Sequence, residues 1–258
     1  MPTYPPINAP NKSRSDTKLR SPVRLFCIPF AGGNSYSYRD LQKHAGTSVE
    51  LLALEMPGRG RRFGEPLLTS LDEMVYDLFA QTAGQLDEPF AIYGHSMGAR
   101  LGCLLVRHLL AQDLPIPQHL FVSGCSAPSA AKKCLRHLLP QADFITMLQR
   151  MDCPPEVLRD EELMEVFEPV LRADFEANDT FEYRRLAPFT VPITVMIGTQ
   201  EQTSRDDALR WQEETTGEFS FEELAGGHFF IFDHLPALGR TIAVSLATGS
   251  SASHGFRG

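Results

Sequence analysis

The segment Gly94-His95-Ser96-Met97-Gly98 constrains this chain more than any other feature, because it joins two patterns that demand a sharp turn between them. The apolar run Phe90 to Tyr93 is typical of a buried strand, and a mostly apolar helical pattern follows from Leu101 to Leu110. G-x-S-x-G at such a junction predicts a nucleophile elbow, in which small residues two positions either side of the serine let the backbone bend. We therefore expect an α/β domain that presents Ser96 as a nucleophile.

A nucleophilic hydroxyl needs a base, and three histidines follow Ser96 at a long separation. His228 follows two glycines after the strand-like run Phe219 to Leu224, where a strand end would present it. His234 is expected at the start of the last helix, where capping accounts for it. His254 lies in a Gly/Ser-rich terminal stretch. We assign the base to His228.

The third member of such a site is an acid that accepts the Nδ1 proton of the histidine and fixes its tautomer. The run Val191 to Gly198 is typical of a buried strand, and Glu201 is the first carboxylate after it. Asp206 and Asp207 compete for this role, but they fall in the expected first turn of a helix, where acids have a structural explanation. We favour Glu201.

Acyl chemistry also needs backbone N–H groups that stabilise the oxyanion of the intermediate. The residue after the nucleophile, Met97, supplies one of them. The second is expected from the glycine-rich loop at 29–34, which follows the apolar run Val23 to Ile28, and Ala31 is our candidate.

Beyond the elbow, several motifs resemble one family, the stand-alone type II thioesterases of polyketide and nonribosomal peptide synthesis in the α/β-hydrolase superfamily. They run in family order from about residue 23 to about residue 246: PFAGG at 29–33, MPGRGRR at 56–62, YGHSMGA at 93–99, SGCSAP at 123–128, PVLRAD at 169–174 and GGHFF at 226–230. Two positions depart from the family pattern. Aspartate is usual where Glu201 stands, and His or Tyr is common where Phe30 stands.

The resemblance implies hydrolysis of acyl thioesters on the phosphopantetheine arm of acyl or peptidyl carrier proteins, by a monomer that needs no metal or redox cofactor. In a Ser-His-acid triad, Ser96 would attack the thioester carbonyl, and His228 would take the serine proton and return it to the thiolate leaving group. Two alternatives remain open. One is an acyltransferase or cyclase, in which an alcohol or amine captures the same acyl-enzyme. The other is a non-catalytic carrier-binding homologue, suggested by the missing aspartate.

The expected fold is a mostly parallel central sheet flanked by helices, occupying residues 21–248. A helical insertion at about 128–188 is expected to form a lid. Its apolar spacings predict two amphipathic faces, one with Phe144, Met147, Leu148 and Met151, the other with Leu163, Val166 and Phe167. Residues 1–20 and 249–258 are expected to be mobile tails.

The formal net charge of −8 argues against nucleic acid as a partner. Docking to an acidic carrier would then use a local basic patch, for which Arg59, Arg61 and Arg62 are candidates unless they pair internally. No apolar run reaches the length of a membrane span, and the first residues lack the apolar core of a secretion signal. The five cysteines, with no C-x-x-C pair, are typical of reduced thiols, so we expect a cytoplasmic protein.

Overall fold

A computed structural model describes residues 21–131 and 134–249. Its centre is a six-stranded sheet in which every neighbouring pair is parallel, in the order β2-β1-β3-β4-β5-β6. The strands are β1 (Val23–Ile28), β2 (Val49–Ala53), β3 (Phe90–His95), β4 (Leu120–Ser123), β5 (Ile193–Gly198) and β6 (Phe219–Leu224). This arrangement confirms the predicted fold class.

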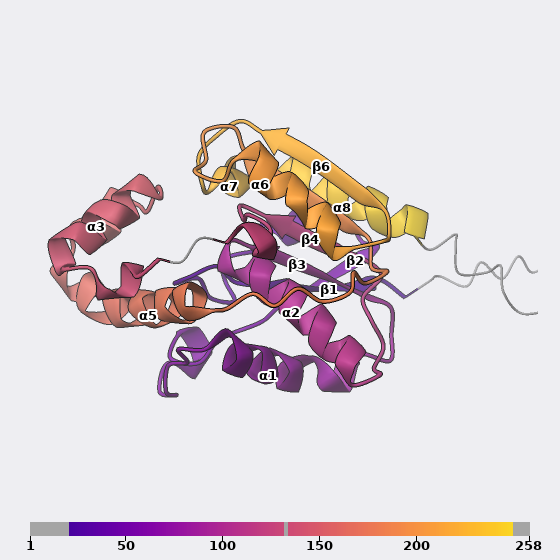
Figure 1. Ribbon diagram of the computed structural model, residues 1–258, viewed down its shortest axis with the longest axis horizontal. Helices are drawn as coiled ribbons and strands as arrows, with labels where there is room; N and C mark the ends of the chain where they lie inside the picture. The colour runs from indigo at the N-terminus through magenta and orange to yellow at the C-terminus, as the bar shows by residue number, and fades with distance from the viewer. Residues whose placement is uncertain (1–20, 132–133, 250–258) are drawn as a thin grey trace, which may run out of the picture.

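Helices cover both faces of the sheet, with α1 and α2 on one side and α8 on the other (Figure 1). The α-helices of the described ranges are α1 (Leu71–Thr82), α2 (Met97–Ala111), α3 (Gln141–Arg150), α4 (Pro155–Arg159), α5 (Glu161–Thr180), α6 (Arg205–Leu209), α7 (Phe230–Asp233) and α8 (Leu235–Gly249). Short 3-10 turns lie at Leu41–Lys43, Gly60–Arg62, Ala83–Gln85, Pro128–Ala130, Arg136–Leu138 and Arg210–Glu214.

The inner strands β1, β3, β4 and β5 are mostly apolar and buried on both faces, because successive side chains point to opposite sides of the sheet and both sides are covered. The edge strand β6 is more polar and only partly buried. In β1, Phe26 and Ile28 belong to the core beneath α1 and α2, whereas Leu25 and Cys27 belong to the core beneath α8. This double burial explains why the inner strands are mostly apolar runs rather than alternating patterns.

The insertion between β4 and β5 is helical, and α3 and α5 extend away from the sheet (Figure 1). It has a small core of its own, formed by Phe144, Leu148, Leu158, Met164, Leu171 and Phe175. The first expected apolar face thus supplies Phe144 and Leu148 to this core. The second face is right only for Phe167, which packs against this core; Leu163 and Val166 are 41% and 46% exposed, and α5 instead turns Met164, Leu171 and Phe175 inward.

The structure also bears on the expected tails, the cysteines and the absence of membrane spans. The expected tails at 1–20 and 249–258 lie outside the described residues, apart from Gly249 at the end of α8. All five cysteines are free, and Cys134 and Cys153 are only half-buried. No helix in the described ranges has the length and apolar character of a membrane span.

A buried histidine at the start of β4 predicts a loss of stability in mild acid. Burial lowers the pKa of His119 from 6.5 to about 4, and the ring stacks on Phe121 and pairs with the Thr194 hydroxyl. Because the unfolded chain binds this proton more readily, the free energy of unfolding falls as pH drops from 6.5 toward 4. We expect a loss of about 2 kcal/mol between pH 7 and pH 5 from this residue.

Urea unfolding of wild type and His119→Gln across this pH range measures the effect. Glutamine keeps a polar partner for Thr194 but does not titrate, so the variant will lose less stability in acid than wild type. Parallel pH profiles for the two proteins would contradict the assignment.

Candidate active site

Ser96 occupies a strained turn between β3 and α2. Its backbone has φ 55° and ψ −117°, a conformation that non-glycine residues rarely adopt. The flanking glycines are required by close approach: a Cβ on Gly94 would lie 2.1 Å from the Gly98 carbonyl oxygen, and a Cβ on Gly98 would lie 2.3 Å from the Ile28 carbonyl oxygen. The expected elbow geometry is therefore present.

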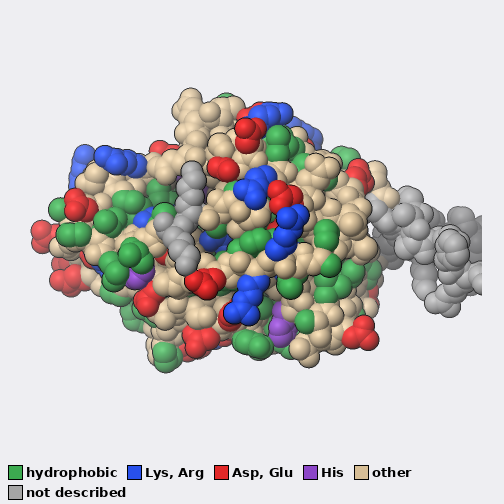
Figure 2. All heavy atoms as spheres, viewed as in Figure 1, with side chains coloured by type: hydrophobic (Ala, Val, Ile, Leu, Met, Phe, Trp, Pro, Cys, Tyr) green, Lys and Arg blue, Asp and Glu red, His purple; other side chains and the backbone are tan. Residues whose placement is uncertain are grey.

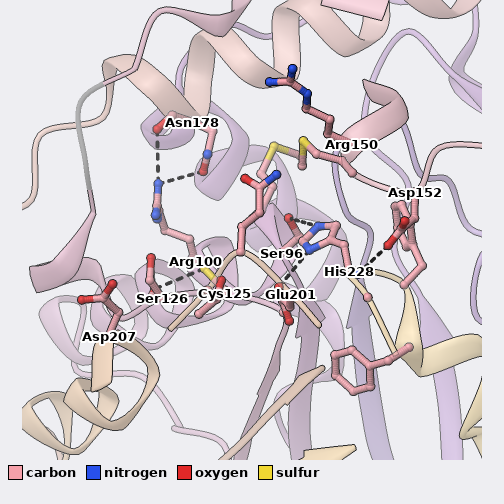
Figure 3. A pocket seen from close by; sticks show the side chains of 18 of the residues that line it. Ser96, Arg100, Cys125, Ser126, Arg150, Asp152, Asn178, Glu201, Asp207 and His228 are labelled. Atoms are coloured by element: carbon pink, nitrogen blue, oxygen red, sulfur yellow. Dashed lines mark hydrogen bonds and ion pairs between the residues drawn. The ribbon is translucent and has the colours of Figure 1, made fainter. Parts of the chain in front are cut away.

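The structure brings Ser96, His228 and Glu201 together in one hydrogen-bonded row (Figure 3). His228 Nε2 lies 3.1 Å from Ser96 Oγ, and His228 Nδ1 lies 2.9 Å from Glu201 Oε1. The three residues follow β3, β6 and β5, so they meet at the carboxyl edge of the parallel sheet. This geometry suits proton transfer from the serine to a histidine that the carboxylate orients.

Contacts within the loop after β5 fix the Glu201 carboxylate. Its side chain is 1% exposed, and its Oε2 accepts from the Gly198 amide at 3.1 Å. The Gln200 amide donates to the Gly226 carbonyl at 2.8 Å, which fastens this loop to the loop of His228. The competing Asp206 and Asp207 lie in the first turn of α6, which Ser204 caps. The structure shows no hydrogen bond between either of these two carboxylates and His228.

His234 and His95 form hydrogen bonds with groups other than the Ser96-His228-Glu201 row. His234 Nε2 pairs with the Ala225 carbonyl at 2.8 Å, and His254 lies outside the described residues. His95 is buried with its Nδ1 2.9 Å from the Ser123 hydroxyl, and burial lowers its pKa well below 6.5. It is a neutral packing residue whose ring centroid lies 4.9 Å from that of His228.

Ser96 and His228 open into a cavity of about 510 Å³ between the end of the sheet and the helical insertion. The insertion contributes Arg136, Met151 and Asn178 to its wall. Of the two expected oxyanion donors, Met97 begins α2 and lines the cavity, whereas Ala31 is half-buried and is not among the lining residues. Their role as donors stays a prediction.

A buried ion pair ties the glycine-rich loop to α5. Asp174, which is 0% exposed, accepts two hydrogen bonds from Arg59 at 2.5 and 2.8 Å and one from the Gly32 amide at 2.7 Å. Arg172 instead bonds Glu168 and the carbonyls of His137 and Leu139. The aspartate of the PVLRAD segment thus ties the insertion to the glycine-rich loop and to Arg59, whereas the bonds of the arginine lie within the insertion.

Removal of one member of the buried pair will destabilise the protein strongly. Asp174→Ala leaves the Arg59 charge buried without a partner, and we expect the free energy of unfolding to fall by about 3–5 kcal/mol. Turnover will fall too, because the loop that carries Ala31 loses the acceptor for the Gly32 amide. Chemical denaturation and steady-state rates measure both effects.

The double variant Arg59→Met plus Asp174→Leu is the matched control, since an apolar pair removes the uncompensated charge. It will recover most of the lost stability but not the contact to Gly32. A double variant no more stable than Asp174→Ala would contradict this explanation.

The expected basic patch is largely absent from the surface, since all three of its arginines pair internally, Arg61 through a 3.9 Å contact between its Nε and Glu55 Oε2. Arg59 is buried against Asp174, and Arg62 bonds Glu65 and Asp77. Arg61 alone of the three is well exposed, at 69% of its side chain. On the face in Figure 2, acidic and basic side chains are intermixed.

Sequence reasoning missed a contact from the insertion to the catalytic loop. Asp152, just after α3, accepts a hydrogen bond from the His228 amide at 2.9 Å. Its backbone has φ 59°, in the left-handed region. The residue precedes a Cys-Pro-Pro run, which marks a turn but gives no signal of this long-range partner. In the described ranges, no group of three or more His, Cys, Asp or Glu side chains could hold a metal ion.

The parallel sheet, the elbow and the Ser-His-Glu row define a serine hydrolase of the α/β-hydrolase class. The family model of the thioesterase domain matches residues 23–246, so the chain belongs to the thioesterase family and is a hydrolase acting on thioesters. This match and the relatives described next together confirm the resemblance to type II thioesterases.

The gramicidin S biosynthesis protein GrsT of Aneurinibacillus migulanus is 36% identical over 82% of this chain and 84% of its own length. Thioesterase PikA5 of Streptomyces venezuelae is 33% identical over 83% of this chain and 77% of its own. Among solved structures, the type II thioesterase BorB from the borrelidin biosynthetic cluster superposes with a TM-score of 0.80 and 32% identity, covering 87% of this chain and 93% of BorB.

Proposed function

We propose that this type II thioesterase releases acyl groups from the phosphopantetheine arm of an acyl or peptidyl carrier protein in polyketide or nonribosomal peptide biosynthesis. The observation that carries the proposal is the row Ser96-His228-Glu201 at the mouth of a cavity that the insertion partly walls. The relatives named after gramicidin S and borrelidin pathways support the placement in such biosynthesis. The insertion acts as a lid over the acyl group.

In the proposed mechanism, Ser96 Oγ attacks the thioester carbonyl carbon while His228 Nε2 takes its proton. The Met97 and Ala31 amides stabilise the oxyanion. Collapse breaks the C–S bond, and His228 gives the proton to the departing thiolate. Water then attacks the acyl-enzyme with His228 as base, which frees the acid and restores Ser96. Glu201 holds the Nδ1–H of His228 and stabilises the imidazolium.

Single-turnover release from a carrier protein loaded with a radiolabelled acetyl or butyryl group tests this function. Free acid as the product, at a rate well above the enzyme-free control, is the expected result. An unloaded carrier that inhibits release from acyl-pantetheine would further support carrier binding. No release from either the carrier or acyl-pantetheine would overturn the proposal.

Product analysis also separates hydrolysis from acyl transfer, because transfer to an added alcohol or amine yields an ester or amide. The 2.9 Å contact from Glu201 to His228 supports catalysis over the non-catalytic alternative, since the glutamate reaches the position that an orienting carboxylate needs.

A further inference from the structure

Arg100 is a buried cation in the first turn of the helix that follows the nucleophile. It lies four residues after Ser96, in α2, and both residues line the same cavity. Arg100 is only 7% exposed. A guanidinium this deep is costly to bury unless its charge and its N–H groups are paired.

The pairing of Arg100 is incomplete. Of the five N–H donors of a guanidinium, Nη1 donates to the Asn178 carbonyl at 3.2 Å and to Asn178 Oδ1 at 2.9 Å, both on α5 (Figure 3). The Nε atom is buried without a hydrogen-bond partner. In the described ranges, the structure gives Arg100 no ion pair with a carboxylate.

The neighbouring Cys125 does not supply a counter-charge. Burial raises the pKa of this thiol, so it is neutral at ordinary pH and is a weak acceptor. The Cys125 Sγ itself donates to the Ser126 carbonyl at 3.3 Å. The neutral thiol is at most a weak hydrogen-bond acceptor for Arg100, so the unpartnered Nε remains a donor for an acceptor that a substrate brings into the cavity.

The charge of the cavity wall indicates which acceptor fits. Among the lining residues that the structure describes, carboxylates outnumber cations, namely Asp152, Asp179, Glu201, Asp207 and Asp233 against Arg100, Arg136 and Arg150. Arg136 is already paired with Asp179. A negatively charged substituent on the acyl group would be repelled by these carboxylates. A neutral carbonyl oxygen can accept a hydrogen bond from the unpaired Arg100 donor without that repulsion.

We propose that Arg100 is a specificity-determining residue that selects acyl groups with a neutral oxygen acceptor, such as a keto group, a few bonds beyond the thioester carbonyl. This inference rests on the proposed thioester hydrolysis and names its substrate class. An apolar chain of the same shape leaves the guanidinium donors unpaired once it displaces water, and that loss disfavours its transition state.

Matched acyl-pantetheine thioesters provide the test, because in each pair the ketone oxygen of one member is replaced by a methyl group and a hydrogen in the other, which keeps the branched outline of the chain. The pairs are 3-oxobutanoyl with 3-methylbutanoyl and 4-oxopentanoyl with 4-methylpentanoyl. The measured quantity is the ratio of kcat/KM for the oxo over the methyl member. Comparing this ratio between variants cancels the intrinsic reactivity of each thioester.

Arg100→Met keeps the length of the side chain but removes its donors, and we expect the ratio to fall at least about tenfold for one or both pairs. Arg150→Met is the matched control: it removes another arginine of the same cavity wall and keeps Arg100 and its Asn178 contact, so the ratio will stay within about twofold of wild type. A purely structural Arg100 would lower both members of a pair equally.

An unchanged ratio in Arg100→Met would overturn the inference, as would an equal fall of the ratio in Arg150→Met. If Arg100→Met does not fold, Arg100→Gln provides the comparison, since its amide can still bond Asn178, and an unchanged ratio there would also overturn it. Failure of wild type to hydrolyse any of the four thioesters would instead reject the hydrolysis on which the inference rests.

Discussion

Ser96→Ala will lower kcat for thioester hydrolysis by roughly 10⁵-fold or more. The methyl group cannot form the acyl-enzyme, so only direct attack by water remains, helped by the oxyanion donors and by substrate binding. This loss of activity tests whether the 3.1 Å contact between Ser96 Oγ and His228 Nε2 serves catalysis. The fold will survive, because alanine has the same backbone limits as serine at φ 55°.

Intact mass spectrometry after rapid mixing with a thioester gives a second readout for this variant. Wild type will carry an acyl adduct that maps to Ser96, and the alanine variant will carry none. Unfolding curves of the two proteins control for loss of structure. Turnover above about a hundredth of wild type in a preparation free of wild-type enzyme would reject Ser96 as the nucleophile.

Glu201→Gln will lower kcat by about 10³–10⁴-fold with little change in stability. The glutamine amide can donate a hydrogen bond to His228 Nδ1, which favours the tautomer whose Nε2 carries the proton. That tautomer cannot accept the proton of Ser96. The loss follows from the 2.9 Å contact of Glu201 to His228 and from the burial of its carboxylate, which leaves the ring no alternative partner from solvent.

Asp206→Asn is the matched control for the acid, because Asp206 is the exposed competitor in α6. It will leave kcat within about twofold of wild type. Glu201→Asp adds a length test: one methylene fewer draws the carboxylate back from His228, so turnover will fall even though the charge is kept. Near wild-type turnover in Glu201→Gln would reject Glu201 as the orienting acid.

Local sequence was enough to predict the elements that carry the site. The apolar run before Ser96 and the glycines at 94 and 98 predict the elbow because the strand, the turn and the close backbone approach are all local requirements. The same holds for β1, β4 and β5, whose mostly apolar runs reflect burial on both faces of a parallel sheet. The edge strand β6 is more polar and only partly buried.

Other features depend on residues far apart in the sequence, and no local pattern encodes them. Asp174 bonds Arg59 and Gly32, which lie more than a hundred residues earlier in the chain, so Arg59 of the expected basic patch is buried in an ion pair. Asp152 likewise accepts a hydrogen bond from the His228 amide, 76 residues later in the chain. The exposed Leu163 and Val166 show that periodicity finds an amphipathic helix but not which side meets its neighbours.

The sequence by itself thus determined the fold class, the family, and Ser96 and His228 as candidates, because each follows from a local pattern that few structures satisfy. Only the tertiary structure decided which carboxylate reaches His228 and that Arg100 lies in the cavity with an unpaired Nε. The first depends on the register of β5 against β6 and the second on the contact of Arg100 in α2 with Asn178 in α5, and both placements are set by side chains distant in the chain.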